Sequence, residues 1–223
     1  MNKEKKITIP KTYGIKYSGS KLKIIPYIVS LITELKDVKT VLDGFSGTTR
    51  VSQALAQLGY HTTASDISIW SDVVANCFLK SSKKDSFYQE IIDYLNSLSG
   101  YDGWYTEYYG SSLESAKRPF QSKNTRKLDA IRDEIEKLNL EWADKSVILT
   151  SLMLGLDKVD STLGHYVAYL SKWSPRSYKD LFLQLPERFS TNQSNHNVIR
   201  ADIFKTVTDN KYDFVYFDPP YGS

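Results

Sequence analysis

The chain has 223 residues and a mass of 25.5 kDa, and its 41% hydrophobic and 25% charged residues fit a globular protein, not a fibrous or disordered one. The single cysteine, Cys77, excludes an intrachain disulfide and a cysteine-based zinc site. Because no apolar run approaches the ~18–20 residues that span a bilayer and the N-terminus lacks a signal region, we expect a cytoplasmic protein. We also expect no bound metal. The net charge of +3 and the pI of about 8.7 permit a polyanionic partner without indicating one.

The first part of the chain alternates between helical and strand patterns. Apolar spacing predicts a helix over residues 22–35, and a β-favouring run predicts a strand over residues 39–43. A glycine-containing turn follows, then a helix over residues 49–58 and a second strand over residues 61–66. A strand, a crossover helix and a strand in this order favour two parallel strands with a right-handed connection.

The middle of the chain, residues 67–197, has a different composition. It is rich in tyrosine and tryptophan and has a basic stretch over residues 117–132. Its periodicity predicts helices over residues 125–138 and 146–156. We therefore expect a large, mostly helical insertion.

The α/β pattern returns in the last part of the chain. Residues 198–202 and 212–217 are predicted strands, with a helical turn over residues 203–207 between them. We therefore expect residues 1–66 and 198–223 to form one α/β domain with a parallel sheet, which the insertion interrupts.

Two features after the first two predicted strands favour a nucleotide-like ligand. The run from Asp43 to Thr48 (Asp-Gly-Phe-Ser-Gly-Thr) joins a strand to a helix, where glycines let the backbone approach a ligand and helix amides donate hydrogen bonds. Asp66 ends the next strand, where a carboxylate can accept both hydroxyls of a ribose. A tight turn without a ligand and a helix N-cap remain the respective alternatives, since the full Gly-x-Gly-x-x-Gly fingerprint is absent.

The sequence Asp218-Pro219-Pro220-Tyr221 follows an apolar strand and is more specific. Two prolines fix the φ angles and remove two amide donors, which leaves a rigid turn rich in acceptors. A carboxylate, a carbonyl and an aromatic ring at such a turn suit an exocyclic amine on a base. The alternative is a structural Pro-Pro turn.

Together these motifs resemble those of the Dam-like (alpha-type) DNA adenine-N6 methyltransferases, which include methylases of type II restriction-modification systems. The run from Lys16 to Lys21 (Lys-Tyr-Ser-Gly-Ser-Lys) is similar to the family's N-terminal cofactor motif, although Ser20 stands where many members have glycine. The order also agrees, with cofactor motifs first, a long insertion next and the catalytic motif last. Asp218 favours adenine over cytosine N4 or protein glutamine as the substrate, because those relatives tend to have Ser or Asn there.

The resemblance implies a Rossmann-like sheet that binds S-adenosylmethionine and an insertion that recognises double-stranded DNA. It implies base flipping and direct methyl transfer to adenine N6, with Cys77 and a metal playing no part. The implied catalytic residues are Asp218, Pro219, Pro220 and Tyr221. The implied cofactor-binding residues are Lys16, Tyr17, Gly19, Lys21, Asp43, Phe45, Ser46, Gly47, Thr48, Asp66, Asp202 and Ile203.

Basic residues of the insertion are candidates for contacts with DNA phosphates, which give affinity but carry no sequence information. They are Lys117, Arg118, Lys123, Arg126 and Lys127. A solvated helix face is the alternative for each of them, and a solvated surface lysine is the alternative for Lys16.

Members of the family continue with further strands after the catalytic motif. We therefore expect a sheet that is truncated on its C-terminal side and a further chain or segment that supplies the missing strands. A DNA-binding fragment without activity, or half of a split methyltransferase, is the competing hypothesis. The sequence leaves open the recognition site, the oligomeric state and the presence of a cognate endonuclease.

Overall fold

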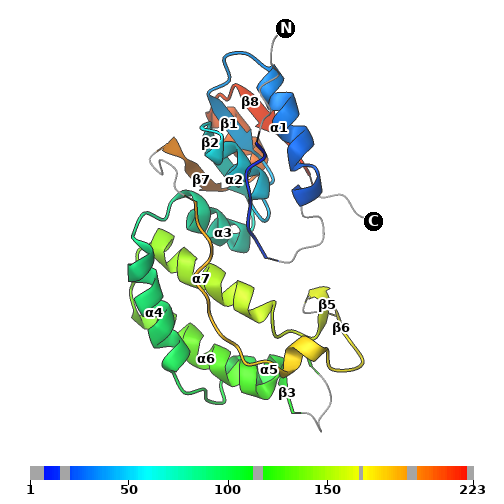
Figure 1. The fold of residues 1–223 in the computed structure, drawn as a ribbon, viewed down its shortest axis with the longest axis vertical. Helices are drawn as coiled ribbons and strands as arrows, with labels where there is room; N and C mark the ends of the chain where they lie inside the picture. The colour runs from blue at the N-terminus through cyan, green and yellow to red at the C-terminus, as the bar shows by residue number, and fades with distance from the viewer. Residues whose placement is uncertain (1–7, 16–20, 113–117, 166–167, 190–194, 220–223) are drawn as a thin grey trace. The chain divides into compact units, whose positions relative to one another are not determined.

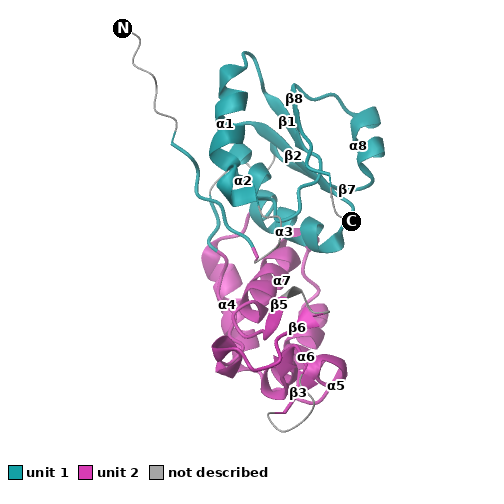
Figure 2. Ribbon diagram, turned by 90° about the vertical axis from the view of Figure 1, so that its right-hand side faces the viewer, with its two compact units in different colours: residues 1–14, 19–81, 187–223 teal, residues 15–18, 82–186 magenta. Residues whose placement is uncertain are grey.

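The computed structural model describes residues 8–15, 21–112, 118–165, 168–189 and 195–219. The chain divides into two compact units (Figure 2). Unit 1 comprises Met1–Gly14, Gly19–Ser81 and Glu187–Ser223, and unit 2 comprises Ile15–Ser18 and Ser82–Pro186.

Unit 1 contains a four-stranded sheet in the order β7-β2-β1-β8 (Figure 1). Its strands are β1 (Thr40–Asp43), β2 (His61–Asp66), β7 (Asn197–Arg200) and β8 (Phe214–Tyr216). Every pairing is parallel, with β2 next to β1, β8 on the other side of β1, and β7 beside β2. The expected parallel sheet is therefore confirmed, and strands that are far apart in the chain are neighbours in it.

Helices cover both faces of this sheet. The crossover helix α2 (Arg50–Gln57) packs beside α1 (Ile25–Glu34), and α3 (Ile69–Leu79) packs on β2 and β7. The short helix α8 (Ile203–Asp209) lies on the opposite face (Figure 2). After α2, Gly59 adopts a φ of 93°, which glycine allows without steric cost.

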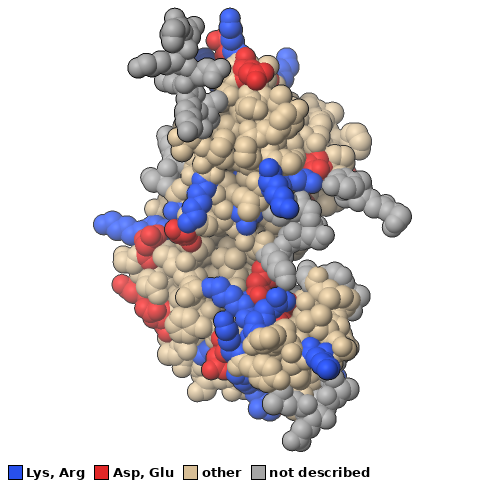
Figure 3. Space-filling model, turned by 45° about the vertical axis from the view of Figure 1, so that its right-hand side comes forward, with Lys and Arg blue, Asp and Glu red and all other residues tan. Residues whose placement is uncertain are grey.

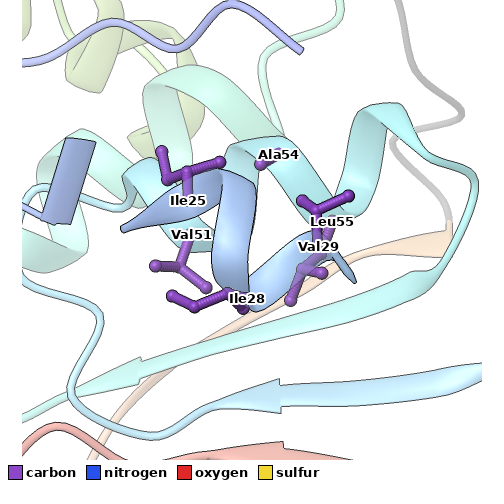
Figure 4. Close-up of a pocket in the computed structure, with 6 residues that line it drawn as sticks. All are labelled: Ile25, Ile28, Val29, Val51, Ala54 and Leu55. Carbon is purple, nitrogen blue, oxygen red and sulfur yellow. The ribbon is translucent and has the colours of Figure 1, made fainter. Parts of the chain in front are cut away.

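The apolar spacing of α1 and α2 explains their packing. Figure 4 shows side chains from the two helices pointing toward one another. All of them are buried: Ile25, Ile28 and Val29 from α1, and Val51, Ala54 and Leu55 from α2. The space between these helices is therefore an apolar seam of the core and offers no polar group to a ligand.

The structure places the boundaries of the insertion inside those expected from the sequence. Residues 67–81 and 187–197 belong to unit 1 instead of the insertion. The physical reason is that α3 buries Ala75 and Leu79 in a cluster with Ala64 of β2 and Val198 of β7.

Unit 2 is mainly helical. Its helices are α4 (Asp85–Ser97), α5 (Trp104–Tyr109), α6 (Ser122–Lys137) and α7 (Trp142–Leu156), with a 3-10 turn, η2 (Pro175–Tyr178). Two small strand pairs complete it, the parallel pair β3 (Gly110–Ser111) and β4 (Phe120–Gln121) and the antiparallel pair β5 (Thr162–His165) and β6 (Ala168–Tyr169).

Two side-chain amides hold the extended segment after η2 against the helices. Asn124 on α6 donates to the carbonyl of Lys179 and accepts from the amide of Leu181. Asn96 on α4 donates to and accepts from the backbone of Leu183 in the same way. An amide side chain copies the donor and acceptor of a peptide group, so these contacts replace a missing strand partner.

Candidate functional site

The glycine turn after β1 lies at the carboxyl edge of the sheet. The amide of Gly44 donates to the carbonyl of Tyr216 at 2.9 Å, and the amide of Ser46 donates to the carbonyl of Ser65 at 3.0 Å. The turn is therefore bonded to the ends of both neighbouring strands. Ligands of open parallel sheets bind at this edge.

Gly44 brings the catalytic motif close to this turn. A Cβ atom at this position would lie 2.6 Å from the ring of Phe217 and 2.8 Å from Cδ1 of Ile203. The rings of Phe45 and Phe217 also meet edge to face, with centroids 6.1 Å apart. The residue directly before Asp218 therefore packs on the glycine turn.

Asp66 connects the turn to the next helix. One carboxylate oxygen accepts from the amide of Gly47 at 2.9 Å, and the other accepts from the amide of Ser68 at 2.8 Å. Gly47 has a φ of 47°, which favours glycine. Asp66 thus bonds to the amide of Ser68, which is itself the N-cap of α3, so Asp66 lies before the helix and is not its N-cap. Each oxygen keeps a second lone pair that can accept from a hydroxyl group.

Three of the expected cofactor residues direct their side chains into the protein. The carboxylate of Asp43 accepts from the amide and hydroxyl of Ser52, at 3.0 and 2.6 Å. Burial raises the pKa of Asp43 to about 6, while the bonds from Ser52 oppose this shift. Ser46 is buried with its hydroxyl 3.2 Å from that of Ser71, and Thr48 is buried too. These side chains shape the turn and leave its backbone to face a ligand.

Asp218 forms an ion pair with Lys21, whose Nζ lies 2.6 Å from Oδ2. Lys21 opens the 3-10 turn η1 (Lys21–Lys23), directly before α1. The last residue of the N-terminal motif and the first residue of the catalytic motif are therefore in contact. Pro219 is exposed.

The remaining residues of these two motifs lie outside the described residues. They are the expected cofactor residues Lys16, Tyr17 and Gly19 and the expected catalytic residues Pro220 and Tyr221.

The start of α8 adds polar and apolar groups at the same edge. Asp202 is its N-cap and accepts from the amide of Phe204 at 2.9 Å. Ile203 is half-buried, whereas Phe204 and Ile67 are 77% and 74% exposed. The sequence analysis did not single out Ile67 and Phe204. Their signal was a large apolar residue directly after Asp66, for Ile67, or two residues after Asp202, for Phe204.

The expected DNA contacts of unit 2 differ in their surroundings. Lys123 pairs with Asp180 at 2.6 Å and Arg126 with Asp102 at 2.6 Å, and all four side chains are substantially exposed. Lys127 donates to the carbonyls of Asn96 and Leu98, and its burial lowers its pKa.

Arg118 is half-buried, and Lys117 lies outside the described residues. Figure 3 shows basic side chains intermixed with acidic ones on the face that it draws. Of the expected DNA contacts, Lys123 and Arg126 are therefore paired with acidic side chains.

The described part of the chain has neither a helix suited to a membrane nor a cluster suited to a metal ion. There, none of the helices combines the length and the apolar character needed to cross a membrane. The same residues contain no cluster of three or more histidine, cysteine or acidic side chains that could hold a metal ion.

Comparison with known proteins agrees with this geometry. A model of the D12 class N6 adenine-specific DNA methyltransferases matches residues 17–223. Type II methyltransferase M.NlaIII of Neisseria lactamica is 28% identical over 218 residues, which cover 93% of this chain and 64% of that protein.

Two further relatives are similar. Modification methylase StsI of Streptococcus sanguinis is 30% identical over 229 residues, covering 94% of this chain and 34% of its own length. Type II methyltransferase M.CviAII of Paramecium bursaria Chlorella virus 1 is 28% identical, and the match covers 94% of this chain and 64% of that protein. The chain thus spans less than two thirds of the length of these three relatives. Because the family model matches nearly the whole chain, the chain belongs to the family of D12 class N6 adenine-specific DNA methyltransferases.

Proposed function

We propose that the chain carries the cofactor-binding and catalytic parts of a site-specific DNA methyltransferase that methylates adenine N6 in a restriction-modification system. One observation carries this proposal. Phe217, next to Asp218, packs on Gly44 of the glycine turn, so the acceptor corner and the expected cofactor turn share one edge of the sheet. The family membership and the type II modification methylases among the relatives support the same function.

Membership of a methyltransferase family implies a methyl donor, and we propose S-adenosylmethionine. The residues at the sheet edge fit it. Gly44 and Gly47 let the backbone approach a ligand, and Asp66 has lone pairs left for ribose hydroxyls. Ile67 and Ile203 offer apolar contacts for an adenine ring beside that carboxylate.

Adenine N6 is a weak nucleophile because its lone pair is delocalised into the ring. The carboxylate of Asp218 and the carbonyl of Pro219 accept hydrogen bonds from its two N–H groups. This favours a pyramidal nitrogen with an available lone pair. S-adenosylmethionine, held by the residues at the sheet edge, would supply a sulfonium methyl group to that lone pair, and its sulfur would leave as a thioether. The nitrogen then releases one proton to solvent. No covalent intermediate with the chain is needed.

The target adenine has to leave the duplex, because its N6 is paired and stacked there. Unpairing and unstacking cost a few kcal/mol, which contacts in the pocket must offset. Tyr221 lies outside the described residues. We propose that it supplies a ring on which the base stacks.

We assign DNA recognition to unit 2. Exposed ion pairs such as Lys123–Asp180 and Arg126–Asp102 are worth little in water, so phosphates can replace their acidic partners. Lys117 and Arg118 remain candidates for phosphate contacts. Lys127 is bound to two carbonyls, which favours a structural role instead.

Transfer of a labelled methyl group from S-adenosylmethionine to DNA tests the proposal. Asp218→Asn keeps the size of the side chain but replaces an accepting oxygen with a donor, so we expect the rate to fall by about 100-fold or more. The matched control is Asp209→Asn, a change of an exposed carboxylate in the same unit, which is expected to leave the rate unchanged. Equal rates for Asp218→Asn and the wild type would contradict the proposal.

A further inference from the structure

The ion pair between Lys21 and Asp218 is closer and more shielded than the other ion pair described in unit 1. Nζ and Oδ2 are 2.6 Å apart, and the two side chains are 20% and 23% exposed. The ion pair between Lys11 and Glu187 in the same unit has exposed fractions of 72% and 64%. Partial burial reduces screening by water, so the pair at Asp218 is the stronger of the two.

The backbone on both sides of the pair is anchored. The amide of Ile24 donates to the carbonyl of Lys21, which fixes η1 at the start of α1. Asp218 directly follows Phe217, whose ring packs on Gly44. The ion pair therefore joins two fixed backbone positions.

The geometry uses only part of the capacity of the Asp218 carboxylate. A lysine ammonium group is a compact point charge, and here it engages one oxygen, Oδ2. An ionised carboxylate has about four lone-pair sites, so acceptor capacity remains for an exocyclic amine. An ionised carboxylate accepts hydrogen bonds and cannot donate one.

We infer that Lys21 is a positioning residue for the methyl transfer, which holds the Asp218 carboxylate in place as an acceptor for the target amine. This role rests on the proposed function. It differs from a contact with the cofactor, which the resemblance of the N-terminal motif implied for this lysine. A cofactor contact affects the affinity for the cofactor, whereas a positioning role affects the rate of transfer once cofactor and DNA are bound.

Three variants separate these roles. Lys21→Gln removes the charge, Lys21→Arg keeps it, and Lys23→Gln is the matched control, because Lys23 is an exposed lysine of the same 3-10 turn. Affinity for S-adenosylhomocysteine is measured by calorimetry on each folded chain. The rate of methyl transfer is measured in a single turnover with saturating cofactor and plasmid DNA.

For Lys21→Gln we expect an affinity within about twofold of the wild type and a transfer rate that is about 10- to 100-fold lower, since a small misplacement of a catalytic group has effects of this size. Lys21→Arg is expected to recover most of the rate, and Lys23→Gln to match the wild type. A loss of affinity that accounts for the loss of rate would make Lys21 a cofactor contact and overturn the inference. An unchanged or higher rate for Lys21→Gln would also overturn it, because the lysine would then be dispensable or would block the site.

A double-mutant cycle of thermal stability tests the ion pair without any catalysis. The effects of Lys21→Gln and Asp218→Asn on the free energy of unfolding should not be additive, and additive effects would overturn the coupling. If the wild-type chain transfers no methyl group, the proposed function fails and this role fails with it. If the wild type is active and Lys21→Gln equals it, the inference alone fails.

Discussion

At the scale of the residue, Gly44 links the glycine turn to the catalytic strand. A methyl group at this position would overlap the ring of Phe217 and Cδ1 of Ile203, so Gly44→Ala must displace these side chains or the turn. We expect a loss of about 1–3 kcal/mol of stability, as for other overpacked sites, together with a large loss of methyl transfer. Unfolding by urea and the transfer assay measure the two effects.

Gly59→Ala is the comparison for this prediction. Gly59 has a φ of 93° and no atom within 4 Å of an added Cβ, so the substitution strains the backbone far from the site without a clash. It should lower stability by about 1 kcal/mol and leave the transfer rate of the folded protein unchanged. If Gly44→Ala transferred methyl groups at the wild-type rate, the packing of Phe217 on Gly44 would not be required for the reaction.

The proximity of the glycine turn to Asp218 could be predicted from the sequence, because both follow strands of one parallel sheet. The contact of Lys21 with Asp218 could not. It joins the two ends of the chain through side chains, and no pattern of strands or helices determines such a pair. The internal roles of Asp43 and Ser46 were hidden for the same reason, since a polar residue in a turn has the same signal whether it faces a ligand or the core.

At the scale of the element, Asn124 of α6 fixes the extended segment after η2. Its side chain is 1% exposed and makes two hydrogen bonds to the backbone of that segment, at 3.0 and 2.8 Å. Asn124→Ala removes the partner of the buried amide of Leu181 and of the partly buried carbonyl of Lys179, so we expect a loss of about 1–3 kcal/mol in the stability of unit 2. Hydrogen exchange of residues 179–184 should rise at the same time.

The control is Gln89→Ala on α4, where an exposed amide side chain bonds only to Asp93. Its effect should stay within about 0.5 kcal/mol. Equal effects of the two substitutions would contradict the role of Asn124 as a clamp.

The elements of the sheet were easier to predict than those of the insertion. The four strands and α2 could be predicted because each is a short segment of regular pattern that lies next to turn residues. The segment that Asn96 and Asn124 hold has no periodic pattern, because its hydrogen bonds go to side chains of distant helices and not to a strand. The helix α3 was assigned to the insertion since its sequence, which is apolar almost all round, does not reveal which unit it packs on.

At the scale of the whole molecule, two buried groups of unit 1 give opposite dependences of stability on pH. Burial lowers the pKa of His196 from 6.5 to about 4. Its contribution to the free energy of unfolding is therefore present above pH 6.5 and is lost as the pH falls toward 4. Burial raises the pKa of Asp43 from 3.8 to about 6, so its contribution is present below pH 3.8 and is lost as the pH rises toward 6. Between pH 4 and pH 6 the two effects oppose each other.

Single substitutions should therefore reveal dependences of stability on pH that cancel in the wild type. Asp43→Asn keeps an acceptor for Ser52 but cannot ionise, so its stability relative to the wild type should rise with pH between 4 and 6. His196→Asn keeps an acceptor for the amide of Thr62, and its relative stability should fall over the same range. Each group can contribute a slope of up to about 1.4 kcal/mol per pH unit. Urea unfolding at pH 4.5, 5.5 and 7 measures the differences, and the comparison with the wild type cancels the titration of the exposed carboxylates. A relative slope of zero in either variant would show that the group it replaces keeps its ordinary pKa in the folded protein, and would contradict the prediction.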